Sequence, residues 1–334
     1  MKKQTPIILF LLFFFLSCDN SKKEKTEAQS KFTVNKPLIR LDSVLFTLKT
    51  IPEITLFLEK NKAIVEPYFD VTSKNFPELA KNLAQYIQNP ALIGFYNNTV
   101  NSPQKIKLDS LQIAINQAFS NIKATYPNYK IPKIYTFFTG FAGKDLLVTD
   151  STIMIGLEYF GGKTATYRPQ VYDYQLNRYE QAYILPSILN QVAINFAKIN
   201  PADKSLLADM LFYGKCYQFT KNMLPEAPDS LITGYSQKQL DATEISQEMV
   251  WAHFIDQKLL YENSPFKKTK YLDERPNTQE ISPDCPGMIG RWLGYKIITK
   301  YLENNKTQTL KNVLANGKAQ EIFEQSKYKG RADL

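Results

Sequence analysis

The chain has 334 residues, a formal net charge of +9 and a hydrophobic content of 44%. Aromatic residues are plentiful, with 20 Tyr and 21 Phe, whereas there are only 13 Gly. This composition argues against a disordered chain and against a β-rich repeat protein. The length allows one large domain or two smaller ones.

The N-terminus has the pattern of a lipoprotein signal peptide. Two lysines precede an apolar run over residues 7–16, and Ser17 and Cys18 follow this run before the sequence turns polar. A basic start, a short apolar stretch and a small residue before a cleavage site are typical of a secretory signal. A cysteine at that site predicts a signal peptide over residues 1–17. It also predicts a lipid-modified Cys18, with diacylglycerol on the thiol and an acyl chain such as palmitate on the new amino terminus.

Two alternatives remain open for this segment. A transmembrane anchor would need about 20 apolar residues, whereas the run over residues 7–16 reaches only about 15 Å, roughly half of a bilayer core. An ordinary cleaved signal would leave Cys18 without a lipid. Phe15 is an unusual residue three positions before a lipid-modified cysteine.

Residues 18–37 predict a flexible tether, because they are polar and have no apolar face to bury. We expect a protein of the cell envelope that its lipid anchors to a membrane and whose body lies in the periplasm. Whether this is the inner or the outer membrane stays open. Nucleic acid is not an expected partner, because the basic residues are scattered among acidic ones and indicate a solvated surface.

The remaining chain, residues 38–334, predicts a single α+β domain in which helices predominate. Helical periodicity marks residues 38–130, where helices are expected over residues 52–61, 76–88 and 109–126, the last with Asp109 as its cap. Residues 131–162 hold short runs rich in Ile, Phe, Tyr, Val and Thr between turn residues. They predict a small antiparallel or mixed sheet that includes a hairpin. The expected strands are residues 133–138, 145–149 and 152–157.

Residues 163–330 again favour helices, so helices should flank the sheet. The expected helices are residues 183–198, 204–224, one long helix over 237–261, 288–304, and two short helices that divide at Asn316 and Gly317.

The only histidine, His253, limits the chemistry that the chain can perform. An active HExxH zinc site needs two histidines on one helix face, and a Ser–His–Asp enzyme would depend on His253 alone. The apolar neighbours of His253 indicate a packed or partly exposed structural residue. A Cys216–His253 nucleophile pair and a Cys216–Cys285 disulfide both stay open. We expect no metal and no cofactor.

Three segments follow one another in a recognisable order. A strand with IGLEYFGG precedes a helix with ILNQVAINF, and a second helix carries LFYGKCYQF. This order resembles the core of zincin metallopeptidases that use a downstream glutamate ligand. The resemblance puts Asn190 and Ile194 at the two His positions, Gln191 at the general-base Glu and Tyr213 at the third ligand. These residues supply no zinc site and no base, so the resemblance implies a zincin-like core without its chemistry. Alternatively, any two amphipathic helices after a small sheet would give this pattern.

Further segments have a distinctive composition: LPSILNQVA, LFYGKCYQFTKNMLPEAPD, GYSQKQL and SPDCPGMIGRWLGYKIITKYL. With IGLEYFGG and the lipoprotein cysteine, they resemble the gliding-motility lipoprotein GldB family of Bacteroidetes bacteria over nearly the whole chain after the signal. The last segment, here called the signature block, brings seven residues together in close order: Asp284, Pro286, Gly287, Gly290, Trp292, Gly294 and Tyr295.

The signature block predicts close packing between a helix and another element, with room for a groove that binds a partner. Pro286 begins a helix, Gly290 and Gly294 leave a smooth helix face, and Trp292 fills a pocket elsewhere.

The family resemblance implies a component required for gliding over surfaces and linked to the type IX secretion machinery. We therefore expect a non-enzymatic, pseudo-metallopeptidase scaffold that binds other proteins of this apparatus, in an oligomeric state that stays open. Two other functions remain as alternatives. One is a cell-envelope hydrolase with an unconventional site around Gln191, Tyr213 and His253. The other is a lipoprotein that binds glycans or peptides.

Overall fold

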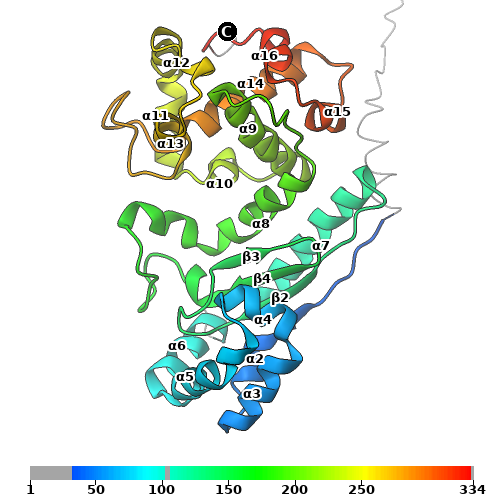
Figure 1. Cartoon of the computed structure of the whole chain (residues 1–334), viewed down its shortest axis with the longest axis vertical. Helices are drawn as coiled ribbons and strands as arrows, with labels where there is room; N and C mark the ends of the chain where they lie inside the picture. The colour runs from blue at the N-terminus through cyan, green and yellow to red at the C-terminus, as the bar shows by residue number, and fades with distance from the viewer. Residues whose placement is uncertain (1–31, 102–105, 332–334) are drawn as a thin grey trace, which may run out of the picture.

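The computed structural model of the chain describes residues 32–101 and 106–331 (Figure 1). The predicted signal peptide and Cys18 lie outside the described residues. The body is an α+β fold in which helices predominate, as the sequence predicts.

The last part of the predicted tether is attached to the body. The backbone N–H of Val34 donates to Ser120 Oγ at 3.0 Å, and the N–H of Lys36 also donates to a side chain of the same helix, α7 (Leu108–Thr125). The predicted tether, residues 18–37, is therefore held against α7 from Val34 onward.

The sheet has four strands in the order β1-β2-β4-β3. Strands β1, β2 and β4 are parallel, and β3 pairs with β4 in the antiparallel sense at one edge. The predicted hairpin is confirmed as β3–β4, whereas β1 has no counterpart among the predictions, because three residues are too few to show alternation. The strands are β1 (Leu38–Arg40), β2 (Lys133–Phe137), β3 (Leu146–Val148) and β4 (Thr152–Gly156).

Different helices cover the two faces of the sheet (Figure 1). Successive residues of β4 point to opposite faces, so Ile153 and Ile155 join the core with α7 and α8 (Ile184–Val192), whereas Met154 joins the core with α3 and α5. The helices before α7 are α2 (Leu41–Leu45), α3 (Ile51–Lys60), α4 (Lys62–Phe69), α5 (Phe76–Gln88) and α6 (Pro90–Val100).

The predicted cap of α7 is wrong. Asp109 lies in the first turn of the helix, and Lys107 occupies the N-cap position without a side-chain hydrogen bond. The helix begins earlier because Leu108 already packs against the core. Tertiary burial here outweighs the local preference of Asp for the cap.

The C-terminal helices form a second core, at the top of Figure 1. The two predicted tail helices are confirmed as α15 and α16. The helices of this part are α9 (Leu206–Met223), α10 (Asp229–Thr233), α11 (Gln237–Ile245), α12 (Gln247–Asp256), α13 (Pro265–Leu272), α14 (Ile289–Asn304), α15 (Leu310–Ala315) and α16 (Ala319–Ser326).

The single long helix predicted over residues 237–261 is wrong. Helix α11 ends before Ser246, and α12 ends before Lys258, whose φ of 53° is left-handed. Buried residues recur every three or four positions across the break, so the periodicity does not reveal it: Leu240, Thr243, Gln247, Val250 and Phe254. The helix predicted over residues 183–198 is also shorter, because α8 passes into a 3₁₀ turn at Ala193–Asn195.

Helices α9 and α14 approach so closely that only glycine fits at their crossing. A Cβ added at Gly294 would lie 1.8 Å from the carbonyl oxygen of Met210, and one at Gly214 would lie 2.3 Å from the carbonyl carbon of Gly294. Two backbones can meet at this distance only where neither helix carries a side chain.

Four other signature-block residues also serve packing, whereas Asp284 is exposed. Trp292 and Tyr295 are buried in α14, and the Tyr295 hydroxyl donates to Asp229 Oδ2 at 3.3 Å. A Cβ at Gly287 would lie 2.4 Å from the carbonyl oxygen of Arg275, and one at Gly290 would lie 3.1 Å from a carbonyl oxygen of α13. The block therefore docks α14 against α9 and α13.

Lys215 on α9 is buried, with 3% of its surface exposed. Its Nζ donates to the carbonyl oxygens of Lys198 at 2.8 Å and of Asn316 at 2.5 Å. The side chain thus ties the segment after α8 to the turn between α15 and α16. Burial lowers the pKa of Lys215 from 10.5 to about 8.

We expect Lys215→Met to change how stability depends on pH. Between pH 8 and 10.5 the unfolded chain binds a proton at Lys215 that the folded chain has lost. The contribution of Lys215 to stability therefore rises with pH in this window, by at most about 1.4 kcal/mol per unit, and is lost as pH falls through the folded pKa. Urea titrations of both proteins at several pH values measure this difference. An identical pH dependence in the variant and the wild type would contradict the expectation.

Candidate functional site

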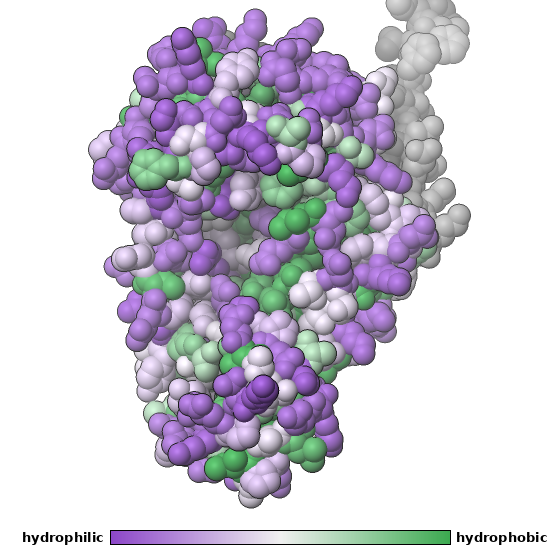
Figure 2. All heavy atoms as spheres, in the orientation of Figure 1, coloured by the Kyte–Doolittle hydropathy of each residue, from purple (hydrophilic) through white to green (hydrophobic). Residues whose placement is uncertain are grey.

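A cavity of about 240 Å³ lies between α8, α9 and the start of α14. Figure 2 shows the surface hollowed in this region, between the C-terminal helices and the part of the body below them. All four residues that the zincin resemblance singles out line this cavity: Asn190, Gln191, Ile194 and Tyr213. The signature block reaches it through Met288 and Arg291, which flank the start of α14.

Asn190 has a structural role in the wall of the cavity. Its Oδ1 accepts from Thr220 Oγ1 at 2.6 Å, and its Nδ2 donates to the carbonyl oxygen of Ile232 at 2.9 Å. The amide thereby joins α8 to α9 and α10. Gln191, the next residue, and Ile194, in the 3₁₀ turn after α8, are exposed at the mouth, and Ile194 keeps 53% of its surface in solvent.

Tyr213 lies under a guanidinium group. The Arg291 guanidinium carbon is 4.1 Å from the centre of the Tyr213 ring, a cation–π distance. Arg291 Nε also donates to the carbonyl oxygen of Leu272 at 2.5 Å. Because Tyr213 adjoins Gly214 and Arg291 lies on α14, the close crossing of α9 and α14 brings the two side chains together.

A salt bridge spans the cavity mouth between the 3₁₀ helix Asp173–Tyr179 and the segment after α13. Arg178 Nη1 is 2.6 Å from Glu274 Oε2, which also accepts from Gln175 Nε2 at 3.1 Å. Arg178 Nη2 donates to the Tyr179 hydroxyl at 3.0 Å. The Tyr179 hydroxyl in turn donates to Asp145 Oδ2, beside β3, at 2.9 Å. Burial, with Asp145, raises the pKa of Tyr179 to about 12, so its hydroxyl stays protonated as a donor at neutral pH.

Cys216 also lines the cavity but is not an activated nucleophile. Burial raises the pKa of its thiol to about 12, so the thiol is protonated at neutral pH. Cys216 and Cys285 are both free and buried, so they form no disulfide. His253 does not line the cavity: its Nε2 lies 3.0 Å from the hydroxyl of Tyr271. In residues 32–101 and 106–331, no group of three His, Cys, Asp or Glu side chains could hold a metal ion.

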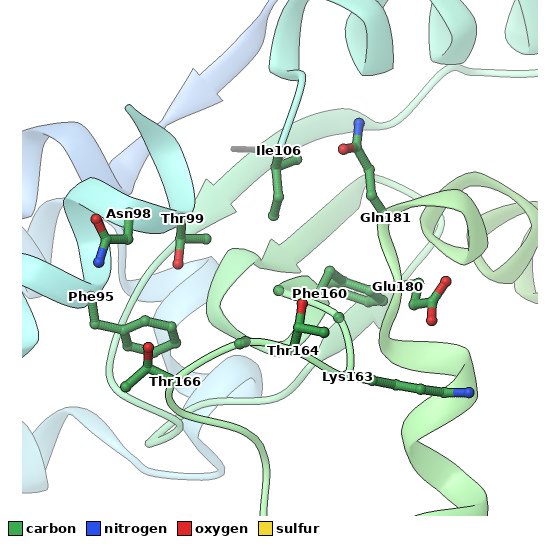
Figure 3. Close-up of a pocket in the computed structure, with 13 residues that line it drawn as sticks. Phe95, Asn98, Thr99, Ile106, Phe160, Lys163, Thr164, Thr166, Glu180 and Gln181 are labelled. Carbon is green, nitrogen blue, oxygen red and sulfur yellow. The ribbon is translucent and has the colours of Figure 1, made fainter. Parts of the chain in front are cut away.

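A larger cavity, of about 720 Å³, lies beside the end of β4. Figure 3 shows Phe95 and Phe160 at its walls, with Lys163 extending away from the centre. Its wall at Ile106 adjoins residues 102–105, which lie outside the described part. None of the four zincin-pattern positions and none of the seven named signature-block residues lines this cavity.

Sequence reasoning missed the three charged residues of the smaller cavity, Arg178, Glu274 and Arg291. A signal existed for Arg291, because it lies inside the signature block between Gly290 and Trp292. Arg178 and Glu274 are far apart in the chain, and only the fold brings them together.

None of the helices in the described part of the chain is long and apolar enough to cross a membrane. No curated protein and no solved structure matches the chain significantly, so the zincin-like core stays a prediction. The family model described as "Gliding motility protein GldB" matches residues 21–330, which is most of the sequence. The chain therefore belongs to the family of the gliding motility protein GldB, a family of lipoproteins.

Proposed function

We propose that this protein is a non-enzymatic accessory lipoprotein of the gliding machinery, held at a membrane by lipid on Cys18 and linked to type IX secretion. It acts by binding partner proteins of that apparatus rather than by catalysing a reaction. Membership of the gliding motility family supports the gliding role, and the sequence around Cys18 supports the anchor.

The chemistry of the α8–α9–α14 cavity supports a binding role. Asn190 is committed to two structural hydrogen bonds, and Tyr213 is covered by Arg291. Gln191 is an amide that cannot accept a proton from water at neutral pH, and Ile194 offers no ligand atom. At the positions where the zincin pattern has zinc ligands and a general base, this chain therefore has side chains that pack, donate hydrogen bonds or bind.

The hydrolase alternative needs Gln191, Tyr213 and His253 to converge on one substrate. Gln191 and Tyr213 share the cavity, but His253 is bonded to Tyr271 on α13 and does not line it. This separation favours the binding role.

Gliding assays of point variants test this function. We expect Cys18→Ala cells to lose gliding and to lose the protein from the membrane fraction, because a lipid chain is the proposed anchor. Cells with His253→Ala should glide at the wild-type rate, because His253 lies outside the cavity. Ser21→Ala is the control for a change near the anchor and should have no effect.

Loss of gliding in His253→Ala cells at a normal protein level would contradict the non-enzymatic role. Stoichiometric metal in the purified protein, or a hydrolytic activity that a single change at Gln191 or Tyr213 abolishes, would contradict it as well.

A further inference from the structure

Arg291 is a cation without a carboxylate partner. In the described part of the chain it takes part in no ion pair: its Nε donates to the carbonyl oxygen of Leu272, and its guanidinium also interacts with the neutral hydroxyl of Tyr217. Arg178, on the other side of the cavity, has its charge matched by Glu274 at 2.6 Å. The two arginines and one glutamate leave one unmatched positive charge in the cavity, and it belongs to Arg291.

The position of Arg291 makes this charge available to a ligand. Its guanidinium is half-buried on the Tyr213 ring, and both side chains line the cavity. Removing a guanidinium from part of its water without a counter-ion costs free energy, which a bound carboxylate would recover through charge-assisted hydrogen bonds. The planar fork of an arginine suits the two oxygens of a carboxylate better than a single ammonium does.

The size of the cavity limits the ligand. Its volume, about 240 Å³, is below the roughly 300–1,000 Å³ of pockets that enclose whole small molecules. It therefore accommodates a side chain rather than a complete metabolite.

The residues around the cavity mouth indicate which kind of ligand would provide this side chain. Ser187 and Gln191 on α8 and Ile194 in the 3₁₀ turn that follows it are spaced three or four residues apart, and all three line the cavity. A chain lying along α8 would pass the mouth and continue on both sides of it. Phe212, Leu231 and Met288 add apolar wall beside the charge, so an apolar neighbour of the acidic residue would also be buried.

We propose that this cavity binds an extended segment of a partner protein through an acidic side chain, whose carboxylate pairs with Arg291 while an adjacent apolar side chain packs beside Ile194. This inference rests on the proposed binding function and specifies the chemistry of the partner.

Matched peptides test it. The full chain, purified in detergent, is titrated against an array of fluorescent heptapeptides with amidated C-termini. Each peptide has a central Glu or Asp between apolar residues, and its counterpart carries Gln or Asn instead. We expect the acidic members that bind to do so about tenfold or more tightly than their amide counterparts, because only they can pair with the guanidinium.

Variants assign the effect to the cavity. Arg291→Gln should abolish the preference for acidic peptides, and Arg291→Lys should keep only part of it. Arg331→Gln is the matched control, because it removes the same charge at an exposed position outside the cavity and should keep the full preference. Near-ultraviolet circular dichroism checks folding, and Arg291→Lys decides the question if Arg291→Gln does not fold.

Equal binding of acidic and amide peptides by the wild type would overturn the inference. So would a preference that survives in Arg291→Gln, or the absence of binding to every acidic member of the array. None of these results contradicts the proposed function, which fails instead if His253→Ala cells lose gliding or if the purified protein shows hydrolytic turnover.

Discussion

Gly294→Ala is expected to cost about 3 kcal/mol or more of folding free energy. The added methyl group would lie 1.8 Å from the carbonyl oxygen of Met210, which is backbone and cannot rotate away. Helices α9 and α14 would have to separate, and overpacking of a close-packed core typically costs about 1–3 kcal/mol even where side chains can adjust. Urea denaturation followed by tryptophan fluorescence measures the loss, since Trp292 is buried in the same helix.

Gly94→Ala is the matched control, because Gly94 also lies inside a helix, α6. A Cβ added there meets nothing within 4 Å. The substitution should leave stability unchanged or raise it by about 0.5–1 kcal/mol, since alanine favours the helix. Similar free energies of unfolding for Gly294→Ala and Gly94→Ala would mean that the crossing of α9 and α14 tolerates a side chain. That result would contradict the close approach of the two backbones described above.

Asp42→Asn is expected to cost about 3 kcal/mol. The Asp42 side chain is fully buried and accepts from Arg40 Nη2 at 2.5 Å, from the Tyr96 hydroxyl at 3.0 Å and from Thr136 Oγ1 at 2.5 Å. An amide cannot accept from all of these donors and would leave the arginine charge unmatched. Removing one partner of a buried ion pair typically costs about 3–5 kcal/mol, and the lower end applies because Arg40 is 32% exposed.

Asp70→Asn is the control for this change. Asp70 pairs with Lys144 at 2.7 Å, but 76% of its side chain is exposed, and exposed pairs contribute only about 0–1 kcal/mol. Thermal and urea denaturation compare the two variants. A loss at Asp42 no larger than that at Asp70 would show that the buried carboxylate does not join β1, α6 and β2 as described.

The helix α5 and the hairpin β3–β4 illustrate what local patterns can predict. Residues 76–88 carry a regular apolar stripe, and the predicted helix matches Phe76–Gln88 at both ends. The hairpin follows from two β-rich runs separated by turn residues. Both depend on contacts between near neighbours in sequence, and such contacts can be predicted from the order of the residues.

Burial and backbone geometry set the boundaries that local patterns miss. The stripe from Leu240 to Val250 runs on through Ser246, yet the helix breaks there. The candidate site shows the same limit. The sequence named Asn190, Gln191, Ile194 and Tyr213 through one resemblance and the signature block through another, but it offered no reason to bring Arg291 of that block to the same cavity.

Composition and periodicity predict an α+β chain and a lipoprotein signal, the single histidine excludes a histidine-rich zinc site, and the resemblance of several segments indicates the gliding motility family. These are properties of single residues and of short segments. They can be recognised without knowing which residues contact them in the fold. The fold alone decides that Gly214 and Gly294 meet, that Arg178 faces Glu274 and that Arg291 covers Tyr213 without a counter-ion. Such pairings depend on how closely segments distant in sequence approach one another. Moving one helix by the width of a side chain would separate these residues.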